Sequence, residues 1–454
     1  MEKLFGLIEA NKDTYIEELF DFLRCKSIST TGEGIEDCAR MLSDIMEACG
    51  IKASIYPTPG HPVVYGEYMV DAALPTILVY GHYDVQPPEP YELWESDPFE
   101  PVIRDGRIFA RGASDNKGQL FVYFKAIEAY KRLYGQLPVN IKFLVEGEEE
   151  ISSPNLNDFV AANKELLACD FTVLSDSCIH ENGTPLIVLG LKGMAFVEIE
   201  LTGAKADMHS SKASGLPSPL WRMVSLLHSI KEGDDGLVKI EGFYDNVRPP
   251  TEKELEAIKK IPYDKDLLMA DNGVDRLVQG RFGDNYYYNL ICEPSCNIAG
   301  LFGGYTGVGS KTVLPNKATV KMDMRLVPNQ TSEEIYAKVR KHLDDHGFED
   351  AKLTCFGNTK PSRTDIDNPY TDLFHEAILK AWEQEPLVYP SLGGAGPNYV
   401  FTDTLGVPCF MIPFSYSDHG NHAPNENIRL DAFFNGIRTI AALLRLLEDK
   451  AVNS

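Results

Sequence analysis

The sequence predicts an α/β protein in which a domain with a largely parallel sheet is interrupted by an inserted α+β domain of the ferredoxin-like type. Up to residue 191, short apolar runs alternate with helical patterns, as in a parallel sheet covered by helices. From residue 192 the strands become two-faced and follow the order strand, helix, strand, strand, helix, strand. After residue 363 the first pattern returns. We therefore divide the chain into residues 1–191, 192–363 and 364–454, of which the outer two form one domain.

The first part of the outer domain combines helices with buried strands. Leu4–Leu23 has helical apolar spacing and a charged face. Gly118–Tyr134 is expected to form an amphipathic helix that ends at Gly135. Three short apolar runs are expected to be buried strands of one sheet, namely Pro75–Tyr80, Asn140–Val145 and Phe171–Leu174.

The inserted domain is predicted from alternation and from helix signals. Apolar residues at 197, 199 and 201, and again at 320, 322, 324 and 326, alternate with polar ones, which indicates half-exposed antiparallel strands. Pro219 begins a helix, and Thr331 with Glu334 forms the capping-box pattern of a second one. A polar insertion of about residues 232–288 lies between the halves. The closing part of the chain is expected to contain two helices around one buried strand, namely Tyr370–Trp382, Leu430–Leu447 and Val407–Ile412.

Composition excludes several partners. The formal net charge is -24 and the pI about 4.8, so nucleic acid and anionic membranes would be repelled. No segment is apolar and long enough to span a bilayer, and no signal-peptide pattern begins the chain. Nine scattered cysteines do not form a disulfide framework. We expect a cytoplasmic protein.

Polar side chains that can bind metals follow each apolar strand of the outer domain. His82 and Asp84 follow the first strand, the acidic run 146–150 the second, and Asp176 the third, while the run 417–422 follows the last. Asp115 comes directly before the amphipathic helix. Since ligands bind at the carboxyl ends of strands in open α/β sheets, these groups are expected to converge on one crevice.

Imidazole nitrogens and carboxylate oxygens in one crevice suit zinc, and such sites also accept manganese or cobalt. Two ions need a bridging carboxylate, and a hydroxide held between them would act as the nucleophile with a nearby carboxylate as general base. Each residue alone has a simpler interpretation: His82 could be a hydrogen-bonded histidine at a strand end, and Glu148–Glu150 a solvated turn. Five such groups at strand ends favour the metal site.

The same residues make the sequence resemble a known family, the co-catalytic zinc aminoacylases, carboxypeptidases, desuccinylases and dipeptidases. The branch that it resembles most is that of the cytosolic non-specific dipeptidases and carnosinases. The similarity spans nearly the whole chain in order, through the stretches ILVYGHYDVQPPEPYELWESDPFEPVIRDGRIFARGASDNKGQ, VNIKFLVEGEEE, LGLKG, ADMHS, GYTGVGSKTVLP, MRLVPN and HGNHAPNE. The resemblance implies a zinc-peptidase-like catalytic domain with a lid and dimerisation domain inserted into it.

The resemblance also implies roles for individual residues. Two divalent metal ions per subunit would be bound, and Asp115 would bridge them. Asp84 would orient a metal-bound imidazole, Glu149 would be the general base, and His419 would be a bystander. The acidic motif leaves a shift by one residue open for the base and its neighbour. The metal ligands implied are His82, Asp115, Glu150, Asp176 and His422.

Three residues of the inserted domain resemble groups that bind substrate. His209 would reach the active site of a partner subunit and stabilise the oxyanion, which requires a homodimer. Arg325 would pair with the substrate carboxylate, and Thr312 would contact the same group. The chain departs from the dipeptidase branch at Gly393–Pro397, where a serine of that branch is replaced by alanine.

The expected function is hydrolysis of the amide bond of dipeptides or dipeptide-like substrates. An aspartate and not a glutamate at position 176 resembles the dipeptidase and aminopeptidase branches more than the acylase branch. The alternative is an N-acyl-amino-acid amidohydrolase that uses the same two metals. A one-metal hydrolase and a non-catalytic binding protein are further alternatives, although no expected ligand or base is missing from the sequence.

Overall fold

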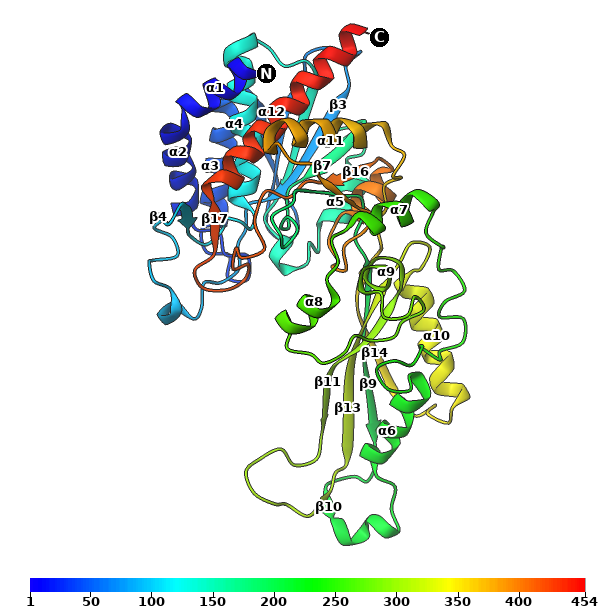
Figure 1. The fold of residues 1–454 in the computed structure, drawn as a ribbon. Coiled ribbons are helices and arrows are strands. Elements are labelled where there is room, and N and C mark those ends of the chain that lie inside the picture. Colours follow the sequence, from blue (N-terminus) through cyan, green and yellow to red (C-terminus); the bar gives the residue numbers. More distant parts are fainter. Residues whose placement is uncertain (454) are drawn as a thin grey trace. The chain divides into compact units, whose positions relative to one another are not determined.

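The computed structural model describes residues 1–453, which divide into two compact units (Figure 1). Unit 1 comprises Met1–Gly190, Arg363–Tyr389 and the chain from Val400 onwards. Unit 2 comprises Leu191–Ser362 and Pro390–Tyr399. The division predicted from the sequence places Pro390–Tyr399 in the outer domain instead. The catalytic and lid roles of the two units stay predictions.

Unit 1 is built on an eight-stranded sheet with the order β1-β2-β6-β3-β7-β16-β8-β15. Its four central strands, β6, β3, β7 and β16, run parallel, while β1 and β2 join one side antiparallel. The prediction of a largely parallel sheet is confirmed. The strands are β1 (Lys52–Tyr56), β2 (Val63–Tyr68), β3 (Thr76–His82), β6 (Asn140–Glu146), β7 (Phe171–Leu174), β8 (Leu186–Val188), β15 (Leu387–Tyr389) and β16 (Cys409–Met411).

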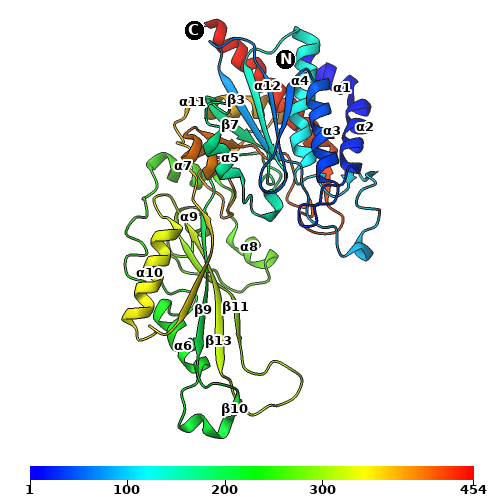
Figure 2. The same cartoon turned by 180° about the vertical axis from the view of Figure 1, so that it is seen from behind.

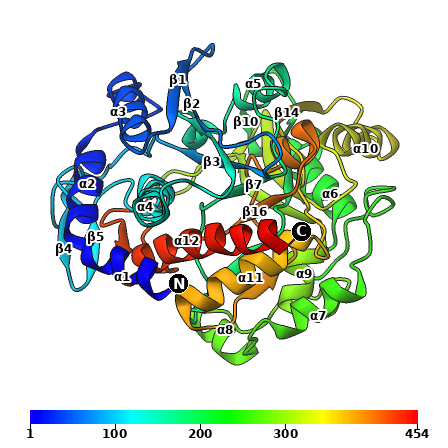
Figure 3. The ribbon, with the colours of Figure 1, turned by 90° about the horizontal axis from the view of Figure 1, so that it is seen from above.

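Helices from both ends of the chain pack together on this sheet. Helix α12 contacts both α4 and α11, and Figure 3 shows α12 between these two helices. Their apolar side chains share one core with the strands. The helices of unit 1 are α1 (Glu2–Ala10), α2 (Lys12–Arg24), α3 (Ile35–Ala48), α4 (Lys117–Tyr134), α5 (Leu156–Ala162), α11 (Pro369–Trp382) and α12 (Leu430–Asn453).

Helix α4 was expected to be amphipathic, and this prediction is wrong. Its residues from Lys117 to Ile127 are all buried, because α1, α2 and α12 cover the side that the sheet does not. The charged Lys125 is accommodated by pairing with Glu18 and Glu128 at 2.5 and 2.7 Å. The predicted end at Gly135 is confirmed, and this residue has a φ of +91°.

Unit 2 is an antiparallel four-stranded sheet with the order β11-β13-β9-β14. Helices α6 and α10 cover one face of this sheet (Figure 2). The alternating buried side chains of the strands form one core with these helices. The order β9-α6-β11-β13-α10-β14 is the predicted ferredoxin-like order. The elements are β9 (Gly193–Thr202), α6 (Pro219–Ile230), β11 (Ser295–Gly303), β13 (Lys317–Leu326), α10 (Ser332–Asp345) and β14 (Lys352–Thr359).

One helix cap differs from its prediction. The Thr331 side chain accepts a hydrogen bond from the Glu334 amide, but the Glu334 carboxylate pairs with Asn246 and Lys338 instead of closing the box. A complete capping box forms at Thr251 in the insertion. The insertion contains three short helices, α7 (Glu252–Lys260), α8 (Lys265–Asp271) and α9 (Tyr286–Cys292).

Two small sheets complete the fold. In unit 1, β17 (Asn427–Arg429) pairs with β5 (Arg107–Phe109), which pairs with β4 (Val102–Arg104). In unit 2, β10 (Met208–His209) pairs with β12 (Val313–Leu314). Among residues 1–453, every helix is too short or too polar to cross a bilayer.

Candidate metal centre

Three adjacent strands of unit 1 deliver the candidate ligands at their carboxyl ends. His82 is the last residue of β3, which lies between β6 and β7. A short helical turn, Glu149–Ile151, follows β6 after two residues, and Asp176 follows β7 after one. Because these strands are parallel neighbours, their ends meet at one edge of the sheet.

Asp115 lies at the centre of the cluster. Its Oδ1 is 3.1 Å from Nε2 of His82, and its Oδ2 is 3.1 Å from Nε2 of His422. The two oxygens of one carboxylate thus face two different imidazoles. This side chain is 7 % exposed, so its charge is stabilised by these neighbours and not by bulk water.

Two further carboxylates lie close to the histidines, one beside each ring. Oδ2 of Asp176 lies 3.7 Å from Nε2 of His82, and Oε2 of Glu150 lies 3.1 Å from Nε2 of His422. Two sets of side chains could each hold a metal ion, because their ligand atoms all lie within 4.8 Å of one another. One set is His82, Glu149 and Asp176, and the other is His82, Asp115 and Glu150.

Asp84 is a completely buried carboxylate that contacts both the His82 ring and the acidic turn. Nδ1 of His82 is 3.1 Å from the Asp84 carbonyl oxygen and 3.4 Å from its carboxylate. The same carboxylate accepts hydrogen bonds from the amides of Glu149 and Glu150 at 3.2 and 3.1 Å. Asp84 therefore holds both the His82 ring and the turn that carries Glu149 and Glu150.

The crowding of acids shifts the protonation of the whole cluster. Burial opposes the charge of His82, but hydrogen bonds to Asp115 and Asp84 raise its pKa well above the ordinary value. Hydrogen bonds to Asp115 and Glu150 raise the pKa of His422 to about 10. Burial, followed by repulsion from Asp115, raises the pKa of Asp176 to about 7.

The pKa values of Glu149 and Asp115 are shifted in opposite directions. Burial, reinforced by the charges of Asp176 and Asp115, raises the pKa of Glu149 well above its ordinary value. Burial works against ionisation of Asp115 too, but hydrogen bonds from His422 and His82 lower its pKa. Asp115 is thus held as an anion while Glu149 holds its proton more readily.

This donor set fits two divalent cations. Five carboxylates face only two imidazoles here, namely Asp84, Asp115, Glu149, Glu150 and Asp176 with His82 and His422. When all five are ionised, even two imidazolium rings leave an excess of negative charge that is costly to bury. Divalent ions bound by nitrogen and oxygen ligands would remove that excess.

Residues that hold the candidate ligands in place were not predicted from the sequence. Nε2 of Gln86 donates to Oε2 of Glu150 at 2.9 Å and to its carbonyl oxygen at 3.2 Å. Glu426 is completely buried against the Asp115 loop. Gln86 and Glu426 both lie within the stretches that carry the family resemblance, and this was the only sequence feature that pointed to them. His419, expected to be a bystander, contacts Oγ of Ser114 at 3.1 Å through its Nδ1.

The predicted substrate-binding residues all lie in unit 2 but do not form one cluster. Nε2 of His209 is 3.4 Å from Oγ1 of Thr312, beside the short β10–β12 pair. Thr312 directly precedes β12, which is only two residues from the Lys317 end of β13. Arg325 lies near the opposite end of β13, where it is opposite Ser295 in β11. The extended strand from Lys317 to Arg325 spans about 27 Å. Within one copy of the chain, Arg325 and Thr312 therefore cannot contact the same carboxylate.

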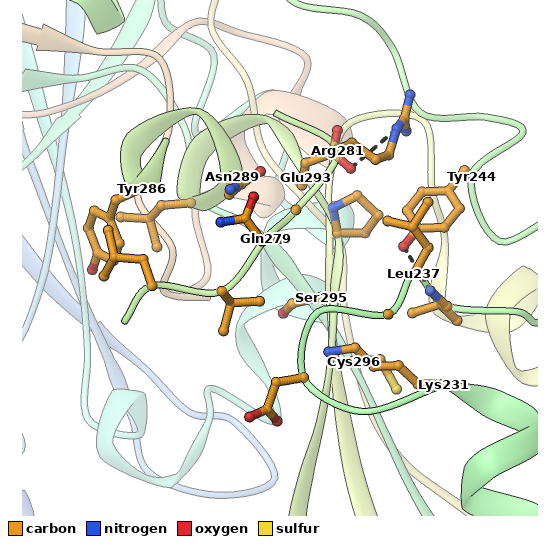
Figure 4. A pocket seen from close by; sticks show the side chains of 18 of the residues that line it. Lys231, Leu237, Tyr244, Gln279, Arg281, Tyr286, Asn289, Glu293, Ser295 and Cys296 are labelled. Atoms are coloured by element: carbon orange, nitrogen blue, oxygen red, sulfur yellow. Dashed lines mark hydrogen bonds and ion pairs between the residues drawn. The ribbon is translucent and has the colours of Figure 1, made fainter. Parts of the chain in front are cut away.

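Unit 2 also contains a separate cavity of about 390 Å³ lined mostly by the insertion (Figure 4). Arg281 and Glu293 pair at 3.5 Å on its wall, and Lys231 lies beside Cys296. Apolar side chains, among them Leu237 and Leu290, make up much of the rest. None of its lining residues belongs to the cluster around Asp115.

Comparison with known proteins identifies the family of this fold and site. Residues 78–446 match the sequence model of Peptidase family M20/M25/M40, which covers most of the chain. The chain therefore belongs to this peptidase family and is an enzyme.

Individual relatives extend over nearly all of the chain. A Cys-Gly metallodipeptidase of Schizosaccharomyces pombe is 29% identical over 470 residues, which are 96% of this chain and 96% of the relative. The Beta-Ala-His dipeptidase of Homo sapiens is 27% identical, with coverages of 97% and 92%. A solved structure described as an M20 family metallo-carboxypeptidase from Sulfolobus solfataricus is 38% identical with a TM-score of 0.88, covering 96% of this chain and 99% of that one.

Proposed function

We propose that this chain is a two-metal peptidase that hydrolyses dipeptides. One observation carries the proposal: the two carboxylate oxygens of Asp115 each lie 3.1 Å from a different histidine, His82 and His422. That is the arrangement which a bridging ligand between two ions needs. His82 and Asp176 would complete one site, and His422 and Glu150 the other. Zinc is the proposed metal, with manganese or cobalt as alternatives.

The side chains around the ligands have separate tasks. When bound, two divalent ions would polarise the scissile carbonyl and lower the pKa of a water molecule. Glu149 would accept the proton of this water and pass it to the leaving amine. Burial and neighbouring acids raise its pKa, which suits a residue that must hold a proton between two steps. Asp84 would keep Glu149 in reach through the hydrogen bond to its amide.

The substrate is proposed to be a dipeptide because the curated relatives that match nearly the whole chain are named dipeptidases. Arg325 would bind the free carboxylate of the substrate, since a guanidinium pairs well with carboxylates. Its nearest ionic partner, Asp323, is 3.7 Å away, so the guanidinium is not held in a close ion pair. A small peptide or an N-acyl amino acid is the proposed partner, and nucleic acid and membranes are not.

The distance between Arg325 and Thr312 supports a homodimer. If both contact one substrate carboxylate, they must come from two copies of the chain, with His209 coming from the same copy as Thr312. Strand β11 is an edge of its sheet and exposes Leu301 and Phe302 by 51% and 56%. An exposed apolar edge strand is a natural place for pairing with a second copy.

Mixed dimers test this arrangement. A His209→Ala chain and a Glu149→Gln chain should each be inactive alone. Mixing equal amounts should produce about half mixed dimers with one complete site each, so about a quarter of the wild-type activity should return. No recovery, in a sample where subunit exchange is demonstrated, would mean that His209 does not act across an interface.

A substrate panel tests the reaction. Metal-stripped enzyme is supplied with zinc or manganese and given free dipeptides beside the same dipeptides N-acetylated. Metal-dependent cleavage of the free set alone is expected. Release of acetate from the acetylated set would favour the alternative function, an N-acyl-amino-acid amidohydrolase. Release of the C-terminal amino acid from that set would instead indicate a carboxypeptidase that needs no free amine, the activity named in the description of the Sulfolobus solfataricus structure.

The proposed location is the cytoplasm. No disulfide links the nine cysteines, all of which lie in the described part of the chain. Reduced thiols in this number suit a reducing compartment.

A further inference from the structure

We propose that Glu426 is a positioning residue that fixes Asp115 and His422 in the geometry needed to share a metal ion. This inference rests on the proposed two-metal function. Glu426 lies four residues after His422 in the chain and contacts the loop that ends at Asp115. It would hold together two ligand segments that are more than 300 residues apart in the sequence.

The Glu426 carboxylate accepts five hydrogen bonds, all from residues 111–115. Oε1 accepts from the amides of Ser114 and Asp115 at 2.9 and 3.0 Å, and from Oγ of Ser114 at 3.1 Å. Oε2 accepts from the Gly112 amide at 3.0 Å and from Nη1 of Arg111 at 2.8 Å. Three backbone N–H groups of one short loop thus point at a single anion, which fixes the course of that loop.

The charge of the buried Glu426 carboxylate is balanced by a buried arginine. Glu426 is 0% exposed and Arg111 1% exposed, and the two form an ion pair at 2.8 Å. The pair is neutral overall, so it adds no net charge beside Asp115. Nη2 of Arg111 also donates to the Pro87 carbonyl oxygen at 3.2 Å, and the guanidinium lies 5.3 Å from the centre of the Trp94 ring.

The backbone around Glu426 makes the connection rigid on the His422 side as well. Directly after Glu426, β17 pairs with β5, with Asn427 opposite Phe109. The ladder is extended by the Ala110 amide, which donates to the Glu426 carbonyl oxygen at 3.1 Å. The chain between His422 and this ladder is only a few residues long. A shift of the Glu426 side chain would therefore move Asp115 relative to His422.

A glutamine at position 426 cannot replace these contacts. Its single carbonyl oxygen could still accept from Ser114 and Asp115, but its amide nitrogen would face the Gly112 N–H and Arg111, which are donors. Arg111 would then be a buried guanidinium without its counter-ion. Loss of such supporting contacts typically weakens metal binding about 10- to 100-fold.

The test is a metal titration of the full chain, which does not depend on any substrate. Zinc is titrated into metal-stripped wild type and Glu426→Gln by calorimetry, and the visible absorption of the cobalt forms reports ligand geometry. We expect two ions in the wild type, a 10- to 100-fold weaker second ion in Glu426→Gln, and an altered cobalt spectrum. The matched control is Glu254→Gln, because Glu254 is another buried carboxylate paired with an arginine, Arg248, at 2.7 Å but lies in unit 2.

The outcomes separate this inference from the proposed function. If folded Glu426→Gln binds the second ion as tightly as the wild type and Glu254→Gln do, the positioning role is wrong. If Glu426→Gln does not fold, Glu426→Asp takes its place; it keeps the charge beside Arg111, but its side chain is one methylene shorter and cannot reach all five donors, so an unchanged second affinity would equally refute the role. A wild-type chain that binds a single ion would overturn the proposed two-metal function, and this inference with it.

Discussion

The role of Glu149 can be distinguished from those of its two acidic neighbours by substituting each of the three residues in turn. Glu148, Glu149 and Glu150 are consecutive, and the sequence leaves open which of them is the general base. In the structure the Glu148 carboxylate accepts from Nδ2 of Asn155 at 2.8 Å, while Glu150 lies 3.1 Å from His422. Glu149 remains as the acid that is close to His82 and Asp176 without an imidazole hydrogen bond of its own.

The expected magnitude follows from these contacts. Glu149→Gln leaves the backbone hydrogen bond to Asp84 in place and removes only the proton acceptor, so kcat should fall about 100- to 10,000-fold. This corresponds to about 2.7–5.5 kcal/mol of transition-state stabilisation. Metal content should remain at two ions per chain. Glu150→Gln should instead lose one ion, and Glu148→Gln should retain both the ions and most of the activity.

The assay combines steady-state hydrolysis of a free dipeptide with metal analysis of the same dialysed samples. Circular dichroism confirms that each variant is folded. The reasoning would be refuted if Glu149→Gln kept near-normal turnover. It would also be refuted if Glu148→Gln were the variant with two ions and no activity, because the base would then lie one residue earlier.

Three further predictions concern metal, substrate and acid stability. Since the pKa of metal-free His422 is raised to about 10, zinc must displace at least one proton at neutral pH, and its affinity should rise at least tenfold per pH unit between pH 6 and 8 when followed by calorimetry. Arg325→Met should lower kcat/KM for dipeptides by about 10- to 150-fold. The same dipeptides amidated at the C-terminus lack the charge that Arg325 would bind, so their kcat/KM should change little. Burial, together with the neighbouring charge of His346, lowers the pKa of His342 to about 4, so the neutral ring is favoured in the folded state and stability should be lost as the pH falls from about 6.5 to 4. Urea unfolding at pH 7 and 5 should show a smaller loss for His342→Gln than for the wild type, and equal losses would contradict this assignment.

The sequence predicted the architecture because its strands have clear periodicities. Continuous apolar runs became the central parallel strands, and two-faced runs became the antiparallel sheet of unit 2. Helix α4 shows where periodicity is insufficient, since its polar residues, such as Lys125, are buried in pairs that no local pattern reveals. The assignment of Pro390–Tyr399 to unit 2 depends on long-range contacts, such as the Lys192 amide to the Gly394 carbonyl oxygen at 2.9 Å.

The candidate ligands could be proposed from the sequence because strand ends converge, but their supporting contacts could not. Gln86 and Glu426 act through hydrogen bonds to residues 64 and 311 positions away in the chain. Their residue types carry no signal of such partners. The separation of Arg325 from Thr312 likewise depends on the length and direction of β13, which only the three-dimensional fold provides.

The charge balance of the cluster connects its folding with its chemistry. Without metal, Asp176 and Glu149 have raised pKa values because burial and mutual repulsion oppose their ionisation, so protons neutralise part of the acidic excess. Metal ions would replace the proton of Asp176, which is a proposed ligand, and leave it ionised. Glu149, which is the proposed base and not a ligand, would remain the acid that exchanges a proton. The same crowding that disfavours the empty cluster would thus supply both a high affinity for cations and a carboxylate ready to move protons.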